Sequence, residues 1–181
     1  MSNFLLSIHV LGAILAIGPV AVAASMFPPA ARRALADPAD ARAGATVRIL
    51  HRITRVYAVI GILVPVFGVA TAVSMGILTQ PWLLVSMTLT ALAAAVLITQ
   101  VIPAQKQVVE GLEQNTRHDD GDVEGAASKG AASATGATTM TRALPDVSLA
   151  RRLGMTTGVF NLLWAVVVVM MIYRPGQGGY A

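Results

Sequence analysis

The sequence predicts an all-α polytopic membrane protein: a bundle of four transmembrane helices with both chain termini outside the cell. Hydrophobic residues make up 55% of the 181 residues and charged residues only 12%, which is unusual for a soluble domain. The charges are also segregated. Every acidic residue, and all but Arg174 of the 13 Lys and Arg residues, fall within residues 28–55 and 104–152. The uncharged stretches between them are long enough to cross a bilayer, which takes about 20 helical residues.

The first predicted span covers residues 4–27. A secretory signal peptide would begin with a positively charged region, whereas the flank Met1-Ser2-Asn3 is uncharged, so we expect a retained helix. Pro28-Pro29 follows it. Because proline lacks the backbone donor and clashes with the preceding turn, the helix is expected to end at Phe27.

Residues 28–55 are predicted to form a basic cytoplasmic segment that is partly helical. Three of its arginines recur at spacings of four and three, on one face of a helix: Arg48, Arg52 and Arg55. This helix is expected to run directly into the second span, residues 56–78. Pro65 lies in the middle of that span, where it predicts a kink.

The third span is predicted at residues 82–103. The short connection Thr79-Gln80-Pro81 predicts that the second and third spans are antiparallel neighbours. Residues 104–152 are expected to form a cytoplasmic loop that starts as a helical extension. Within it, residues 117–141 are rich in Gly, Ala, Ser and Thr and are predicted to be disordered. A fourth span, residues 153–173, completes a single membrane domain over residues 1–181.

The distribution of positive charge predicts the orientation. Both charged segments carry Lys and Arg, whereas the connection between the second and third spans carries none. The positive-inside rule therefore places both charged segments in the cytoplasm and indicates a multi-pass protein of the cytoplasmic membrane. The basic residues flank membrane segments and are expected to meet anionic lipid headgroups. Nucleic acid is not expected as a partner, since aromatic residues are not interleaved with them.

His9 is the one ionisable side chain other than tyrosine inside the predicted spans, and such residues are candidates for function. Two interpretations remain open. His9 can be a neutral imidazole that bonds to a carbonyl or hydroxyl of a neighbouring helix, for example at Thr88 or Ser74. Alternatively, it can bind a metal or haem.

Haem held by two histidines would require a second ligand at the same depth. His51 lies at the cytoplasmic boundary, and the residues from His9 to Phe27 correspond to roughly 25 Å along the membrane normal. One iron cannot bridge that distance. Haem b bound by His9 alone, or by His9 with a methionine, remains an alternative.

A set of methionines shares the predicted depth of His9 in the outer leaflet: Met75, Met87, Met170 and Met171. Thioether and imidazole ligands suit Cu(I), and the chain contains no cysteine. The sequence thus gives His9 with these methionines as a candidate metal site. The simpler interpretation is that the methionines are apolar packing residues, in which case no cofactor is expected.

Small residues also mark candidate contact surfaces. Gly154 and Gly158 form a GxxxG pattern in the fourth span, which allows close helix approach within the bundle, in a homodimer or in a larger complex. Asn161 lies near mid-membrane, where a polar side chain usually joins helices by hydrogen bonds. The spans contain no carboxylate, which disfavours a proton-driven pump.

The first-helix sequence HVLGAILAIGPVAVA, the arginine-flanked second helix and the ending MMIYRPG resemble a bacterial family of small, four-helix, predicted integral membrane proteins of unknown function. The membrane domain of CopD-type copper-resistance proteins is more distantly similar and also carries an early-helix histidine, and HemJ-type protoporphyrinogen oxidases are a weaker match. The family resemblance implies the fold and the location rather than a reaction.

Three functional hypotheses follow. The first is a non-enzymatic accessory or interaction subunit that packs through its small-residue faces. The second is copper or haem handling at an outer-leaflet site built on His9 and the methionines. The third is a haem-dependent oxidoreductase, for which the expected second histidine at a usable depth is missing.

Overall fold

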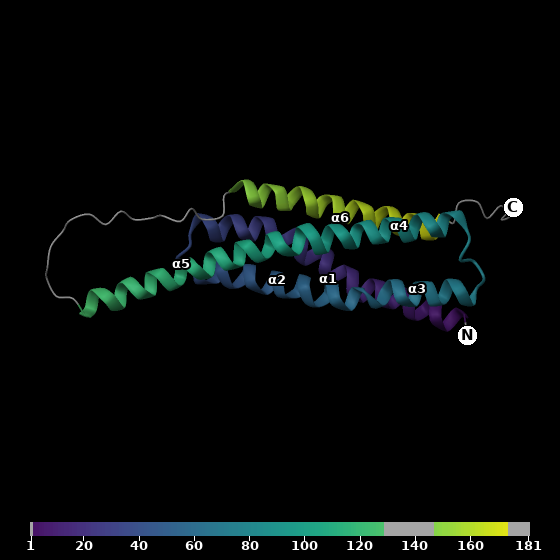
Figure 1. Cartoon of the computed structure of the whole chain (residues 1–181), viewed down its shortest axis with the longest axis horizontal. Coiled ribbons are helices and arrows are strands. Elements are labelled where there is room, and N and C mark those ends of the chain that lie inside the picture. The colour runs from purple at the N-terminus through teal and green to yellow at the C-terminus, as the bar shows by residue number, and fades with distance from the viewer. Residues whose placement is uncertain (1, 129–146, 174–181) are drawn as a thin grey trace.

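The computed structural model describes residues 2–128 and 147–173, and within these ranges every regular element is helical. The helices are α1 (Ser2–Ala36), α2 (Ala41–Gly61), α3 (Leu63–Ser74), α4 (Pro81–Val96), the π-helix η1 (Leu97–Val101), α5 (Ile102–Ser128) and α6 (Val147–Tyr173). They form four long rods that lie side by side (Figure 1). Each rod is long and apolar enough to cross a membrane, over Phe4–Ala36, Ala41–Ser74, Pro81–Asn115 and Arg151–Tyr173. The predicted all-α, four-span fold class is confirmed.

α1 is longer than the sequence predicts. It passes through Pro28-Pro29 and ends at Ala36, so the expected end at Phe27 is wrong. Proline removes a helical hydrogen bond and strains the turn before it, but helical packing can compensate. Beyond the prolines, Ala31 and Leu35 are buried in a cluster with residues of α2 and α5. Burial of this extension stabilises the helix across the proline pair.

α2 begins at a side-chain cap. One carboxylate oxygen of Asp40 accepts hydrogen bonds from the backbone N–H groups of Arg42 and Ala43, at 2.9 and 3.2 Å, and so satisfies donors that have no partner within the helix. As expected, the basic helix runs into the second span. The rod is interrupted at Ile62, as predicted from Pro65, because proline has no N–H to offer the carbonyl of Gly61, four residues earlier.

α3 ends at Ser74 rather than at residue 78, so the connection to α4 is longer than the predicted turn. Gly76 has φ +66°, a conformation that glycine adopts without steric cost. The N–H of Ile77 bonds to the carbonyl of Ala72 at 3.1 Å. This satisfies one carbonyl at the helix end, as glycine-based helix terminations do.

α4, η1 and α5 form one continuous rod. The π-helical turn Leu97–Val101 ends two residues before Pro103, whose missing N–H removes one hydrogen bond from this part of the helix. α5 then extends to Ser128, so residues 117–128 are helical and the prediction of disorder there is wrong. Adding residues to an existing helix avoids the unfavourable nucleation step. Residues 129–141 of that predicted disordered segment lie outside the described residues.

The rods are arranged as two pairs. α1 packs along both α2 and α3, whereas α4 packs along α6, and α1 joins the pairs through contacts with α6. In Figure 1, α3 and α4 separate on leaving their connection, with α4 beside α6 and α3 beside α1. The second and third spans are antiparallel neighbours, as expected from their short connection, although α3 and α4 do not pack along each other within the described chain. The two rods meet beside their connection, where Trp82 and Leu83 share a cluster with Ala72. They meet again toward the charged end, where α2 packs on α5.

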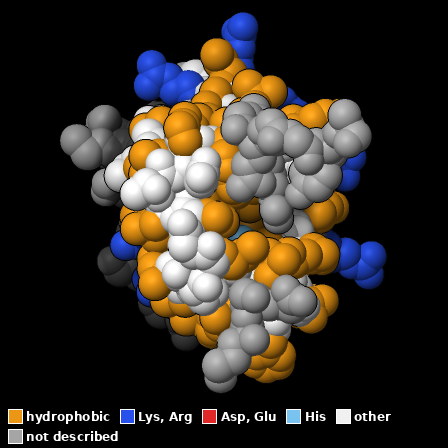
Figure 2. All heavy atoms as spheres, turned by 90° about the vertical axis from the view of Figure 1, so that its right-hand side faces the viewer, with side chains coloured by type: hydrophobic (Ala, Val, Ile, Leu, Met, Phe, Trp, Pro, Cys, Tyr) orange, Lys and Arg blue, Asp and Glu red, His pale blue; other side chains and the backbone are white. Residues whose placement is uncertain are grey.

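The two ends of the bundle differ in charge and packing. We call the end with the α1–α2 connection and α5 the charged end, and the end with the α3–α4 connection the apolar end. A large buried cluster lies toward the charged end and includes Ala23, Phe27, Ala31, Ala34, Leu35, Val47, Leu50, Val108, Leu112 and Leu153. The apolar end holds the small cluster of Ala72, Trp82 and Leu83. Viewed from the apolar end, the described surface is mostly hydrophobic, with Lys and Arg side chains at its margin (Figure 2).

Candidate functional site

His9 lies toward the apolar end, where it faces α3 and only 9% of its surface is exposed. Its Nδ1 is 2.9 Å from the carbonyl oxygen of Val64. A carbonyl oxygen can only accept a hydrogen bond, so Nδ1 carries a proton and is the donor. In a neutral ring the lone pair is then on Nε2. A bond from His9 to a carbonyl of a neighbouring helix is one of the two kinds of contact expected from the sequence.

Gly68 makes room for the imidazole one turn after Val64. A Cβ atom at this position would lie 2.8 Å from Cε1 and 3.2 Å from Nδ1 of His9, closer than van der Waals contact allows. A side chain larger than hydrogen would therefore displace the ring. The suggested partners of His9 bond elsewhere: the Thr88 hydroxyl donates to the Leu84 carbonyl, and that of Ser74 to the Thr71 carbonyl.

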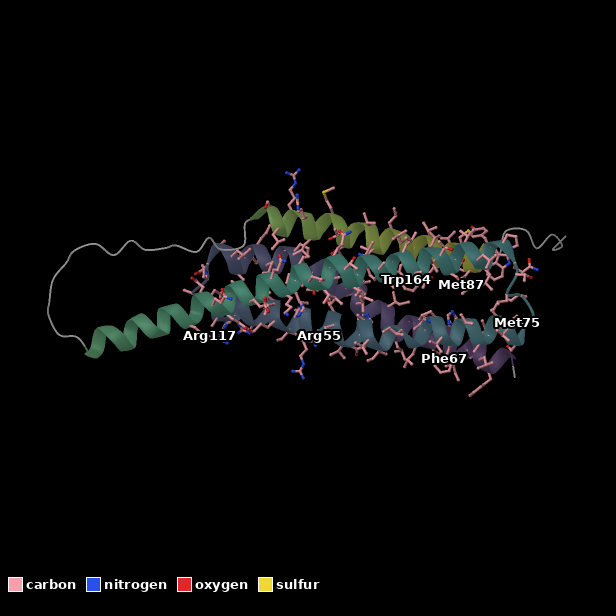
Figure 3. All side chains as sticks on the ribbon, in the orientation of Figure 1. Arg55, Phe67, Met75, Met87, Arg117 and Trp164 are labelled. Carbon is pink, nitrogen blue, oxygen red and sulfur yellow. The ribbon has the colours of Figure 1, made fainter. Side chains whose placement is uncertain are left out.

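The four candidate methionines lie in the same half of the molecule as His9. Met75 caps the end of α3, Met87 lies on the second turn of α4, and the other two lie in the last turn of α6: Met170 and Met171. Figure 3 places Met75 and Met87 on different rods. Met75 and Met87 are 37% and 39% exposed, and Met170 packs against the Trp82 cluster. Convergence of their sulfur atoms with His9 stays a prediction.

His51 lies in the other half of the bundle. Its Nδ1 is 3.3 Å from Oε1 of Gln105 on α5. His9 bonds to Val64, and the chain from residue 51 to residue 64 rises by about 20 Å along the helix. This separation agrees with the argument against a haem held by both histidines. Within residues 2–128 and 147–173 no group of three or more His, Cys, Asp or Glu side chains could hold a metal ion.

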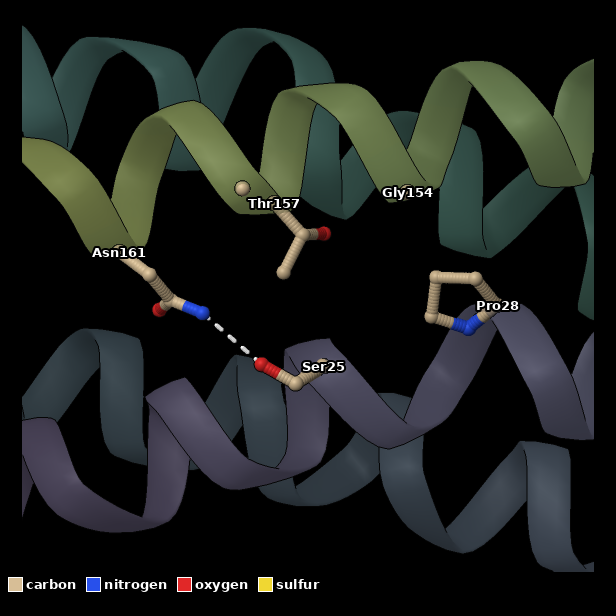
Figure 4. A pocket seen from close by; sticks show the side chains of 6 residues that line it. Ser25, Pro28, Gly154, Thr157 and Asn161 are labelled. Carbon is tan, nitrogen blue, oxygen red and sulfur yellow. Dashed lines mark hydrogen bonds between the residues drawn. The ribbon is translucent and has the colours of Figure 1, made fainter.

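A small groove between α1 and α6 is a feature that the sequence did not reveal as a unit. It has a volume of about 150 Å³ and is lined by Ser25, Pro28, Gly154, Thr157, Gly158 and Asn161. The Asn161 amide Nδ2 donates to the Ser25 hydroxyl at 2.8 Å, and this bond joins the two helices (Figure 4). Sequence reasoning singled out the glycines and Asn161 separately. Ser25 and Pro28 were missed, because nothing in the sequence shows that α1 passes this face of α6.

Two polar atoms in the groove have no hydrogen-bond partner within the described chain: the Thr157 hydroxyl and Oδ1 of Asn161. Thr157 is only 3% exposed. A buried polar group without a partner costs free energy. The groove therefore has unused hydrogen-bonding capacity, in contrast to the many threonines elsewhere that bond back to their own helix.

The fold and these sites define a polytopic helical membrane protein with few polar groups inside its bundle. Residues 3–130 match the family model of a predicted integral membrane protein, DUF2269. The chain belongs to this family, and the family expected from the sequence is confirmed. No curated protein and no solved structure matches the chain. The similarity to CopD-type membrane domains stays a prediction.

Proposed function

We propose that the protein is a non-enzymatic interaction subunit of the cytoplasmic membrane, which binds the transmembrane helices of a partner. One observation carries this proposal: the membrane-spanning rods bury few of their residues against one another. In the most apolar window of each rod the buried share is 11, 17, 28 and 17%, in chain order. Association inside a membrane depends on helix packing. Rods that use so little of their surface internally retain a large surface for a partner.

The pairing of the rods supports the same proposal. α3 packs on α1 and α4 packs on α6, so neither of these consecutive helices uses the other along its length. Exposed apolar residues remain on both, including Val66 at 57% on α3 and Leu84 at 51% on α4. A partner helix placed along either rod would bury this surface without unfolding the subunit.

The proposal includes the orientation of the helix bundle in the membrane. The α1–α2 connection and the described parts of residues 104–152 lie toward one end of the bundle, and the α3–α4 connection, which has no Lys or Arg, lies at the other. The positive-inside rule then places the charged end in the cytoplasm and both termini outside. Because the chain has no cysteine, single cysteines at Thr79 and at Ala39, both exposed, can report the orientation. A membrane-impermeant maleimide should label Thr79→Cys in intact cells and Ala39→Cys only after lysis.

Co-purification tests the function itself. Tagged protein extracted in a mild detergent should elute as a complex larger than one chain with its detergent, and should carry a stoichiometric second protein or a second copy. Extraction in a harsh detergent should release the single chain. A monodisperse monomer in the mild detergent, with no partner at any expression level, would contradict the proposal.

A second function, metal or haem handling at His9, is favoured by one specific contact. Metal-ligating histidines usually donate their other ring N–H to a carbonyl or carboxylate, which fixes the ring and its tautomer. The Nδ1–H bond from His9 to Val64 has this form and directs the lone pair to Nε2. Soft methionine ligands in the same half would suit Cu(I).

Metal analysis distinguishes this candidate from the first. Protein purified after growth with copper should carry one copper per chain, His9→Ala should lose it, and His51→Ala should retain it. Absence of copper from the wild-type protein, or equal copper in His9→Ala, contradicts copper binding. After expression with ample haem, absence of a Soret band contradicts haem binding.

A further inference from the structure

The groove between α1 and α6 lies beside cationic side chains at its charged end. On α1, Ser25, Pro28 and Arg32 follow one another at spacings of three and four, so they share a helix face. On α6, the same spacings place Arg151 on the face of Gly154 and Gly158. Arg32 and Arg151 are both exposed. The spacing therefore places one arginine of each helix a single turn beyond the groove residues, toward the charged end.

Neither arginine has a carboxylate partner on its own helix. α1 and α6 contain no Asp or Glu, and the ion pair found within the described chain joins Lys106 and Glu110 on α5. Two guanidinium groups that approach one point can bind a phosphate through charge-assisted hydrogen bonds. At the headgroup level of a membrane, such a pair favours an anionic lipid.

The size of the groove distinguishes between a helix and a lipid acyl chain as its occupant. A helix is about 10–12 Å across with its side chains, and a volume of about 150 Å³ cannot contain a segment of one. The same volume equals that of about five water molecules, which suits a few methylene groups of a single acyl chain. From Gly154 to Asn161 the groove extends about 10 Å along α6.

The polar atoms of the groove lie where such a lipid would need them. Thr157 is on the groove face one turn beyond Gly154, its hydroxyl has no partner and its side chain points between the two helices (Figure 4). The Thr157 hydroxyl can donate a hydrogen bond to a lipid ester carbonyl, which lies between the phosphate and the acyl chains. The two glycines expose a wall where an added Cβ would meet nothing within 4 Å, and this open wall can accommodate an acyl chain.

We propose that the α1–α6 groove binds one anionic phospholipid, with its phosphate on Arg32 and Arg151, an ester carbonyl on the Thr157 hydroxyl and the start of an acyl chain over Gly154 and Gly158. This site is separate from the partner surface on α3 and α4. Binding of the lipid and assembly with a partner can therefore succeed or fail independently.

Native mass spectrometry of the delipidated full chain tests the proposal, with phosphatidylglycerol and phosphatidylcholine titrated in turn. The wild-type protein should bind one phosphatidylglycerol at a concentration at which phosphatidylcholine does not bind. The double variant Arg32→Gln/Arg151→Gln should weaken this first binding event about tenfold or more, because charge-assisted hydrogen bonds are lost. Gly158→Leu, which fills the groove, should also weaken it.

Two further variants keep the result interpretable. Arg48→Gln/Arg52→Gln removes the same charge from exposed positions on α2 and should leave the first binding event unchanged. Thr157→Val conserves shape and should weaken binding about threefold, the value of one hydrogen bond in a membrane. Circular dichroism checks that each variant is folded.

Three outcomes would overturn the site. They are equal binding of the two lipids, equal loss in both arginine double variants, and a second copy of the chain or another protein that occupies the groove and is displaced by Gly158→Leu.

Discussion

The two ends of the bundle hold their helices together in different ways. Toward the charged end, α1, α2, α5 and α6 contribute large apolar side chains such as Phe27 and Leu153 to one cluster that is almost fully buried. Toward the apolar end, the rods meet through a smaller cluster around Trp82 and through the contact of His9 with α3. The comparison indicates that the charged end stabilises the fold, while the apolar end leaves helix surface free for other molecules.

The largest expected effect is at the charged end. Phe27→Ala removes a side chain with 0% exposure and leaves a cavity, which should lower the free energy of unfolding by about 3–5 kcal/mol. The matched control Phe4→Ala changes a residue that is 70% exposed near the apolar end and should have little effect. Unfolding in mixed micelles measures both. Equal losses of unfolding free energy in the two variants would contradict the proposed difference in packing between the two ends.

An intermediate effect is expected at His9. Gly68→Ala places a methyl group 2.8 Å from the imidazole, so the ring must move and its bond to Val64 must weaken. We expect a loss of about 1–3 kcal/mol and a change in the ¹⁵N resonance of Nδ1.

Gly18→Ala is the control for that variant. It adds the same methyl group to α1 with nothing within 4 Å and should be neutral or slightly stabilising. If Gly68→Ala behaves like Gly18→Ala, then the His9 contact does not hold α1 against α3.

The smallest effect is expected where polar groups join α1 to α6. Ser25→Ala removes the acceptor of the Asn161 amide, and hydrogen bonds between membrane helices contribute about 0.6 kcal/mol on average. Thr88→Val removes a hydroxyl that bonds within its own helix and should change stability less. A loss above about 2 kcal/mol for Ser25→Ala would mean that this hydrogen bond, rather than apolar packing, fixes the two pairs of rods.

Much of the fold could be predicted from the sequence, because the membrane imposes a length on each uncharged segment. The four spans, the basic helix that runs into the second span and the break near Pro65 all follow from charge, length and proline chemistry. The path of α1 through Pro28-Pro29 could not be predicted. It depends on burial of Ala31 and Leu35 against helices that are distant in sequence.

The pairing of the rods and the candidate sites also depend on contacts between helices that are distant in sequence, which could not be predicted. Sequence reasoning identified His9, since an isolated ionisable group inside a membrane is conspicuous, and left open a hydrogen bond to a carbonyl or hydroxyl or the binding of a metal or haem. The particular carbonyl of Val64 could not be named, because a backbone acceptor has no sequence signature, and the suggested side chains of Thr88 and Ser74 bond elsewhere. The α1–α6 groove was missed for a related reason, since small and weakly polar residues gain meaning only when two helices face each other.

Site-specific photo-cross-linking in native membranes tests whether the helix surface toward the apolar end binds other proteins. A photoreactive amino acid would replace Val66 on α3 or Leu84 on α4, with Ile49 as the control, an exposed residue of α2 near the charged end. We expect discrete protein adducts of reproducible mass from Val66 or Leu84 and none from Ile49. Adducts to lipid alone from both apolar-half positions would contradict this expectation.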